Sequence, residues 1–277
     1  MTSPAGLPQL RVVAADAVSP TAAAFLADAL AAAVAERGVA HWATTGGSAA
    51  PGIYRALASS PLRERVDWSR VHTWWGDDRF VPYDHPLSNV LPLDTGLLGP
   101  RGVDTGSTAW GQEPAPYADF GVTIPPEQLH PWPVAAAIAQ GETPGWAADR
   151  YAETLAALAP ADADGTPMLD LVVLGVGPDG HILSVFPGSA VWDAPGSCAP
   201  VPAPTHIEPH VERVTFHPRV VAAARAVLVV TAGAGKAATL GRAWTGDDAR
   251  ELPVRAARLG TATWVLDEAA AAELPTG

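Results

Sequence analysis

The chain has 277 residues, a formal net charge of −12 at pH 7 and an isoelectric point near 5.0, which argues against a nucleic-acid or anionic membrane surface as its partner. Its one cysteine, Cys198, excludes an internal disulfide and a cysteine-rich zinc site. There is no basic segment before an apolar core near the N-terminus and no uncharged apolar run of about 18 residues, so we expect a soluble, cytoplasmic protein, either a monomer or a weak homo-oligomer.

Apolar runs alternate with alanine-rich helical stretches along the chain, which favours one α/β domain over residues 1–277. The predicted fold has three layers, α/β/α, with a mostly parallel, Rossmann-like sheet and a small appended lobe. It begins with a short edge strand over 11–14. A helix then follows that Ser19 and Pro20 start and Gly38 ends.

The strand expected over 39–44 leads into a glycine-rich turn and then a helix from Pro51 to about Ala58. The turn consists of Thr45, Gly46, Gly47 and Ser48. In such an arrangement the backbone N–H groups and the helix N-terminus point at a ligand, which suits phosphate. A helix cap in a tight turn explains the same residues equally well. The Lys-Ser/Thr pair of a P-loop is missing, so ATP and GTP are not expected.

A third strand, expected over 71–75, ends in a charged segment. This segment is Gly76, Asp77, Asp78 and Arg79. Two carboxylates and an arginine after a strand are typical of a functional site, although surface ion pairs have the same composition. Ser88 and Asn89 are expected to start or line the next helix.

Residues 99–133 are rich in proline, glycine and aromatic residues and have no clear period, which indicates an irregular insertion, a lid or a small lobe. Trp110, His130 and Trp132 are candidates for ligand contact, with structural packing as the favoured role. A helix is expected over 144–158. Its buried face is predicted to carry Trp146, Tyr151 and Leu155.

The run Leu171 to Leu174 has no polar alternation, which is typical of a parallel strand buried on both faces. Ligands bind beyond the carboxyl ends of such strands, here residues 175–181. The letters match the dinucleotide fingerprint G-x-G-x-x-G, but Pro187 leaves no room for the helix that the fingerprint requires. We therefore expect the glycines to let the backbone approach a small ligand, with Asp179 and His181 beside it.

The last part of the chain repeats the pattern of strand, glycine-rich break and helix. We expect strands over 213–216, 226–230 and 263–266, with a helical turn over 218–224 and a break over 231–235. A helix is expected from 236 to 244, and a short final helix is expected after its cap, Asp267. Lys236, the only lysine of the chain, lies at the start of a helix. It is a candidate phosphate ligand, the alternative being an exposed helix lysine.

Four segments together resemble the 6-phosphogluconolactonase family. They are TGGSAAP at 45–51, WWGDDRFVP at 74–82 with the Ser-Asn pair at 88–89, GVGPDGH followed by SVFPGS within 175–189, and RVTFHPRVVAAARAVLVVTAGAGKA at 213–237. They occur in the order typical of the family. The family usually has Asp-Glu-Arg where this chain has Asp-Asp-Arg at 77–79, and Ser-Thr-Pro where it has SAAP at 48–51. The resemblance implies a NagB/RpiA/CoA-transferase-like fold and hydrolysis of 6-phospho-D-glucono-1,5-lactone to 6-phosphogluconate in the pentose phosphate pathway.

The implied reaction needs a base, donors for an oxyanion and cations for a phosphate. His181, steered by Asp179, is expected to take the proton from the attacking water. Arg79 or backbone N–H groups would stabilise the oxyanion. The residues expected to bind the substrate or its phosphate are Lys236, Arg213, Arg79, Gly46, Gly47, Ser48, Asp77, Gly177 and Gly180. The resemblance implies neither a metal nor a cofactor.

Three other functions are weighed against this one. A serine hydrolase is disfavoured because Ser48 is not part of a G-x-S-x-G elbow. A glucosamine-6-phosphate deaminase or isomerase would share the glycine-rich loop, but FPGS after the loop and Phe-Val-Pro after Arg79 fit the lactonase pattern better. A non-catalytic sugar-phosphate sensor would not require a titratable His181 beside Asp179.

Overall fold

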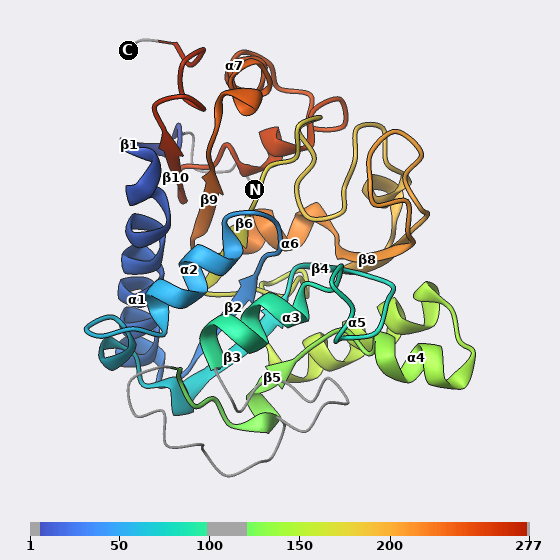
Figure 1. The fold of residues 1–277 in the computed structure, drawn as a ribbon. Coiled ribbons are helices and arrows are strands. Elements are labelled where there is room, and N and C mark those ends of the chain that lie inside the picture. The colour runs from blue at the N-terminus through green and yellow to red at the C-terminus, as the bar shows by residue number, and fades with distance from the viewer. Residues whose placement is uncertain (1–5, 99–120, 276–277) are drawn as a thin grey trace.

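The computed structural model describes residues 6–98 and 121–275. At the centre of these residues lies a seven-stranded parallel sheet in the order β1-β10-β9-β6-β2-β3-β5 (Figure 1). Its strands are β1 (Gln9–Val13), β2 (Ala40–Thr44), β3 (Val71–Trp75), β5 (Leu129–His130), β6 (Leu171–Leu174), β9 (Val227–Thr231) and β10 (Ala262–Asp267). The predicted mostly parallel sheet is confirmed.

Helices pack on both faces of this sheet. They are α1 (Val18–Arg37), α2 (Ala50–Leu57), α3 (Val90–Leu93), α4 (Val134–Gln140), α5 (Pro144–Leu158), α6 (Pro218–Ala223) and α7 (Ala237–Thr245). On one face the Tyr54 hydroxyl of α2 hydrogen-bonds the Thr44 hydroxyl of β2. On the other face the Tyr151 ring of α5 meets the Trp74 ring of β3 edge-on at 5.8 Å. The three-layer prediction is therefore confirmed.

Helix α1 is the one described helix that is long and apolar enough to cross a membrane by length and composition. Its buried side chains include Leu26 and Leu30, and the helix packs against β2, β9 and β10. Burial against the sheet thus accounts for its apolar composition. Gly38 ends the helix as predicted, but Ser19 does not cap it, because the helix starts at Val18 and its N-cap makes no side-chain hydrogen bond.

A second, antiparallel sheet has the order β4-β8-β7, with β4 at Asp77–Arg79, β7 at Cys198–Val201 and β8 at Arg213–Phe216. The sequence predicts no strand at 77–79, but these residues pair with β8. In that register Asp77 lies opposite Thr215, and Arg79 lies opposite Arg213. Residues so far apart in the chain give no local signal of their pairing.

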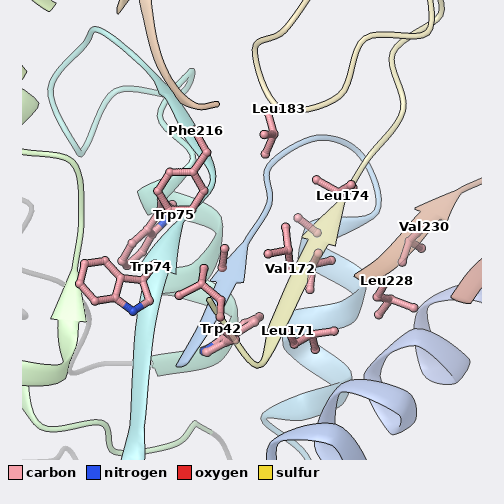
Figure 2. Packing of buried hydrophobic residues seen from close by; sticks show 14 of the residues in the cluster. Trp42, Trp74, Trp75, Leu171, Val172, Leu174, Leu183, Phe216, Leu228 and Val230 are labelled. Carbon is pink, nitrogen blue, oxygen red and sulfur yellow. The ribbon is translucent and has the colours of Figure 1, made fainter. Parts of the chain in front are cut away.

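The core lies mainly between the central strands and the helices that cover them. Figure 2 shows Trp42 of β2 near Leu171 of β6, and Trp75 of β3 near Phe216 of β8; all four side chains are fully buried. Each buried side chain of this size contributes on the order of 1.5–3 kcal/mol relative to exposure. Because the strands are buried on both faces, polar side chains collect at their ends.

Two predicted segments differ from the structure or lie partly outside it. Of the expected insertion at 99–133, residues 99–120, with Trp110, are not among the described residues, whereas 129–130 form edge strand β5. The final helix is wrong, because residues 268–274 form turns. The Asp267 carboxylate does accept the N–H of Ala270 at 2.8 Å, but it also accepts the N–H of Gly233 at 2.9 Å.

The order of the strands reverses once within the central sheet. From β2 the chain adds β3 and β5 towards one edge, and from β6 it adds β9 and β10 towards the other. Connections that leave two neighbouring strands in opposite directions open a crevice beyond their carboxyl ends. The crevice expected here lies beyond β2 and β6, where the two glycine-rich segments begin.

Candidate active site

A cavity of about 240 Å³ lies at the carboxyl ends of β2, β6 and β9 and beside strand β4. Its lining contains Thr45, Gly46, Gly47, Ser48, Ala49, Asp77, Arg79, Asn89, Gly175, Val176, Gly177, Pro178, His181, Leu183, Ile207, Glu208, Arg213, Val230, Thr231 and Lys236. The structure thus brings together all the site residues predicted from the sequence except Asp179 and Gly180. Asp179 lies directly behind His181, and Gly180 packs against the side chain of Leu252.

The His181 imidazole is paired with the Asp179 carboxylate, with 2.5 Å between Nδ1 and Oδ1. Partial burial opposes ionisation of this carboxyl, but hydrogen bonds from His181 and His206 outweigh it and hold the pKa of Asp179 well below its ordinary value. Because an ionised carboxylate only accepts hydrogen bonds, the proton of neutral His181 lies on Nδ1. The lone pair is therefore on Nε2, where it is available to a ligand or a water molecule.

Gly177 is the residue that allows the imidazole to lie where it does. A Cβ atom at this position would overlap Nδ1 and Cε1 of His181, and the Gly177 N–H donates to the His181 carbonyl at 2.9 Å. The sequence predicts that this glycine admits a ligand to the backbone. The close approach seen in the structure is instead that of the imidazole ring, so the glycine fixes the position of His181.

Strand β4 presents its side chains alternately to the cavity and to the protein interior. Asp77 and Arg79 line the cavity. The Asp77 carboxylate accepts hydrogen bonds from Ser184 Oγ at 2.5 Å and Asn89 Nδ2 at 3.2 Å. Nη1 of Arg79 donates to the Leu87 carbonyl at 2.7 Å and to Asn89 Oδ1 at 3.0 Å. Asn89 therefore holds both charged side chains in place.

Asp78, between them, points into the interior and is fully buried. Its carboxylate accepts hydrogen bonds from the N–H of Arg79 at 2.8 Å, from the N–H of Asn89 at 2.7 Å and from Ser88 Oγ at 3.1 Å. Burial raises the pKa of Asp78 to about 7. These bonds tie the segment that carries Asn89 to strand β4. Ser88 and Asn89, expected at the start of a helix, do directly precede α3.

Three cationic side chains converge on the cavity. Arg79, Arg213 and Lys236 form no ion pair with a carboxylate of the described residues. Arg213 is only 2% exposed, and its guanidinium lies 5.2 Å from the centre of the Phe186 ring. Burial lowers the pKa of both Arg213 and Lys236, and attraction to the nearby carboxylates opposes this only in part.

The turn after β2 closes the cavity on the opposite side. The Thr45 hydroxyl accepts the N–H of Gly175 at 3.3 Å and so joins this turn to the segment that follows β6. A Cβ atom at Gly46 would overlap the side chain of Asn89, so only glycine permits this approach. Gly47 and Ser48 complete the lining where α2 begins.

Reasoning from the sequence missed the contribution of residues 206–208. The sequence predicts only a proline-rich connection over 191–209, yet Ile207 and Glu208 line the cavity and His206 hydrogen-bonds Asp179. The one signal available was the presence of titratable residues in a proline-rich stretch. His130 and Trp132, by contrast, are buried in the core, which confirms their favoured role in packing.

Metal ligation was considered for the same residues. Within 6–98 and 121–275, no group of three or more His, Cys, Asp or Glu side chains has the geometry to hold a metal ion.

The fold and the cavity define an α/β protein with a cationic small-molecule site at the carboxyl ends of its parallel strands. Residues 14–266 match the family described as glucosamine-6-phosphate isomerases/6-phosphogluconolactonase. The chain belongs to this family. The resemblance seen in the four sequence segments is thereby confirmed.

Individual relatives agree with this assignment over nearly the whole chain. The 6-phosphogluconolactonase of Streptomyces coelicolor is 34% identical over 268 residues, which cover 93% of this chain and 91% of the relative. The 6-phosphogluconolactonase of Mycobacterium leprae is 34% identical over 252 residues, which cover 90% of this chain and 91% of the relative. The solved structure of 6-phosphogluconolactonase from Trypanosoma brucei has a TM-score of 0.75 at 25% identity and covers 98% of this chain and 100% of its own.

Proposed function

We propose that the chain hydrolyses 6-phospho-D-glucono-1,5-lactone to 6-phosphogluconate, as the names of its relatives indicate for them. The observation that carries the proposal is the convergence, in one cavity, of a histidine paired with a carboxylate and three cations that form no ion pair with a carboxylate of residues 6–98 and 121–275. A phosphorylated lactone requires both features, because it carries an anion to be bound and a carbonyl carbon to be attacked by water. We also propose that the protein acts in the cytoplasm as a monomer or weak homo-oligomer.

In the proposed reaction, Nε2 of His181 removes a proton from a water molecule as its oxygen attacks the lactone carbonyl carbon. Asp179 stabilises the imidazolium that forms and keeps the proton of the neutral ring on Nδ1. The tetrahedral intermediate then breaks the bond between the carbonyl carbon and the ring oxygen. The imidazolium returns its proton to that oxygen, which leaves a hydroxyl group and a carboxylic acid that ionises.

The cations have different roles in this proposal. Lys236 precedes α7, where its ammonium and the backbone N–H groups of the helix start attract a phosphate. Arg213 lies beside Arg79 in the register of β4 and β8, so their guanidinium groups extend the positive region across the cavity. The N–H groups of the turn at 45–48 are further donors for the phosphate or for the developing oxyanion.

The test is a lactonase assay with the freshly formed 6-phosphorylated lactone, following acid release, with ammonia release from glucosamine 6-phosphate measured in parallel. We expect acid release and no ammonia. His181→Gln should lower kcat by about 10² to 10⁴ while leaving KM nearly unchanged. Lys236→Met should mainly raise KM, and more for the phosphorylated lactone than for the unphosphorylated one.

Several outcomes would contradict the proposal. Ammonia release without lactone hydrolysis would assign the chain to the deaminase branch of its family. Tight binding of 6-phosphogluconate with no turnover of either substrate would favour a sugar-phosphate sensor. An equal change of KM for both lactones in Lys236→Met would remove this residue from the phosphate site.

A further inference from the structure

The Asp179 carboxylate is shared between two imidazoles. Oδ1 lies 2.5 Å from Nδ1 of His181, and Oδ2 lies 3.0 Å from Nε2 of His206. The His181 and Asp179 side chains are 17% and 20% exposed, whereas that of His206 is 51% exposed. The structure therefore contains a chain of hydrogen bonds from solvent, through His206 and Asp179, to the proposed base.

The Phe186 ring packs against both imidazoles of this hydrogen-bond chain. Its centre lies 4.8 Å from that of the His181 ring and 5.4 Å from that of the His206 ring, which it meets edge-on. The guanidinium of Arg213 lies over the same ring at 5.2 Å. One aromatic side chain thus contacts both imidazoles and a cation of the cavity, so His206 has a defined position despite its exposure.

We infer that His206 is a positioning residue for His181, an inference that rests on the proposed hydrolysis. Its Nε2–H holds one carboxylate oxygen of Asp179, which fixes the carboxylate so that the other oxygen receives the Nδ1–H of His181.

Other charged groups lie near these hydrogen-bonded residues and must be left unsubstituted in a test. Lys236 and Arg213 both interact electrostatically with Asp179, and Glu208 lines the cavity two residues beyond His206. None of these contacts depends on the His206 imidazole. Substitution of His206 alone therefore changes one partner of Asp179 and leaves the cations in place.

The first experiment measures kcat and KM for His206→Ala and His206→Gln. In His206→Ala, loss of one hydrogen bond should lower kcat roughly two- to tenfold at unchanged KM. His206→Gln, whose amide can still donate a hydrogen bond to the Asp179 carboxylate, should restore kcat. His210→Ala is the matched control, since His210 belongs to the same segment and its Nδ1 lies 2.7 Å from the Pro204 carbonyl oxygen instead of contacting Asp179.

A coupling measurement decides whether His206 acts through Asp179. In the Asp179→Asn background, His206→Ala should have no further effect on kcat. Full additivity of the two substitutions, or an equal loss in His210→Ala, would overturn the inference, because either result indicates a general loosening of the segment.

The second readout does not depend on the substrate. In ¹⁵N-histidine-labelled protein, the His181 ring signals should show the Nδ1–H tautomer, and His206→Ala should shift population towards the Nε2–H tautomer. Absence of lactone hydrolysis by the unchanged chain would contradict the proposed function but not this effect. Unchanged His181 signals in His206→Ala would contradict the positioning role even in an active lactonase.

Discussion

The His181 imidazole lies against the backbone at Gly177 and is held by the Asp179 carboxylate. The neutral ring therefore has one orientation and one tautomer before any ligand arrives. Such preorganisation matters because a displacement of about 1 Å of a reacting group can lower a rate about 10²-fold. At the scale of single residues, the position of the His181 base depends both on the absence of a side chain at Gly177 and on the Asp179 carboxylate.

Gly177→Ala should accordingly reduce kcat about 10²-fold, because the new Cβ must displace the imidazole. The expected fall in the thermal midpoint is small, since the ring lies at the edge of the cavity rather than in the core. Gly196→Ala is the control, as its Cβ would have no neighbour closer than 3.7 Å. Lactonase assays and thermal unfolding of both variants would test this, and full activity of Gly177→Ala would contradict it.

At the scale of elements, strand β4 places two charged side chains in the cavity and one carboxyl in the interior. The buried carboxyl, Asp78, has its pKa raised to about 7 by burial, against about 3.9 in an unfolded chain. The folded protein therefore binds this proton more tightly than the unfolded chain does. The stabilisation is complete below about pH 4 and is lost as the pH rises through 7.

Asp78→Asn removes this titration and retains an oxygen for the two backbone N–H groups that Oδ1 now accepts. Relative to the unchanged chain, the variant should gain stability between pH 4 and pH 8 by as much as roughly 4 kcal/mol. Denaturant unfolding across this range measures the difference. Asp84→Asn, at an exposed position, is the control. A stability difference between Asp78→Asn and the unchanged chain that does not vary with pH would contradict the raised pKa of Asp78.

Strands β2, β3 and β5 carry a stack of three histidines on the face that α5 covers. The His72 ring lies 4.5 Å from that of His41 and 5.1 Å from that of His130, and Nδ1 of His72 lies 2.9 Å from Nε2 of His130. Burial, with repulsion from the neighbouring rings, lowers the pKa of His41 to about 4 and that of His130 to about 3. The stack is therefore stable only while it is neutral.

Because these folded-state pKa values lie below about 6.5, the stabilisation is present above pH 6.5 and is lost as the pH falls towards 4. His130→Phe keeps a ring on Trp74 and removes one titrating group. The variant should lose less stability than the unchanged chain between pH 6.5 and pH 4, as measured by the thermal midpoint. His210→Phe, at an exposed position, is the control and should not alter the dependence of the thermal midpoint on pH. If His130→Phe showed the same pH dependence as the unchanged chain, this account would be contradicted.

At the scale of the whole molecule, the two sheets share one core. The Tyr151 hydroxyl of α5 accepts the Trp75 N–H at 3.0 Å and donates to the His130 carbonyl at 2.7 Å, both in the central sheet. Its ring lies 3.9 Å from that of Trp132 and 5.9 Å from that of Phe216 in the small sheet. Helix α5 thus joins the sheets through contiguous buried contacts.

We therefore expect the chain to unfold as one domain. Calorimetry should show a single transition whose calorimetric and van't Hoff enthalpies agree. Tyr151→Ala should lower the midpoint of that transition without splitting it. Two separate transitions, one of them shifted alone by Tyr151→Ala, would instead indicate that the small sheet is an independent unit.

The sequence by itself determined the central strands and the residues that follow them. Continuous apolar runs such as Leu171–Leu174 encode strands buried on both faces, and their carboxyl ends identified His181 and Lys236 without knowledge of the fold. Local pattern suffices here because burial on both faces leaves only the ends of parallel strands for polar chemistry.

Only the tertiary structure decided the rest. It paired Asp77–Arg79 with β8, which made a strand where the sequence predicts none and turned Asp78 away from the cavity. It also brought His206 to Asp179, 27 positions away along the chain. These contacts join segments whose own sequences carry no periodic signal, so they are fixed by packing and hydrogen bonding across the folded chain rather than by local pattern.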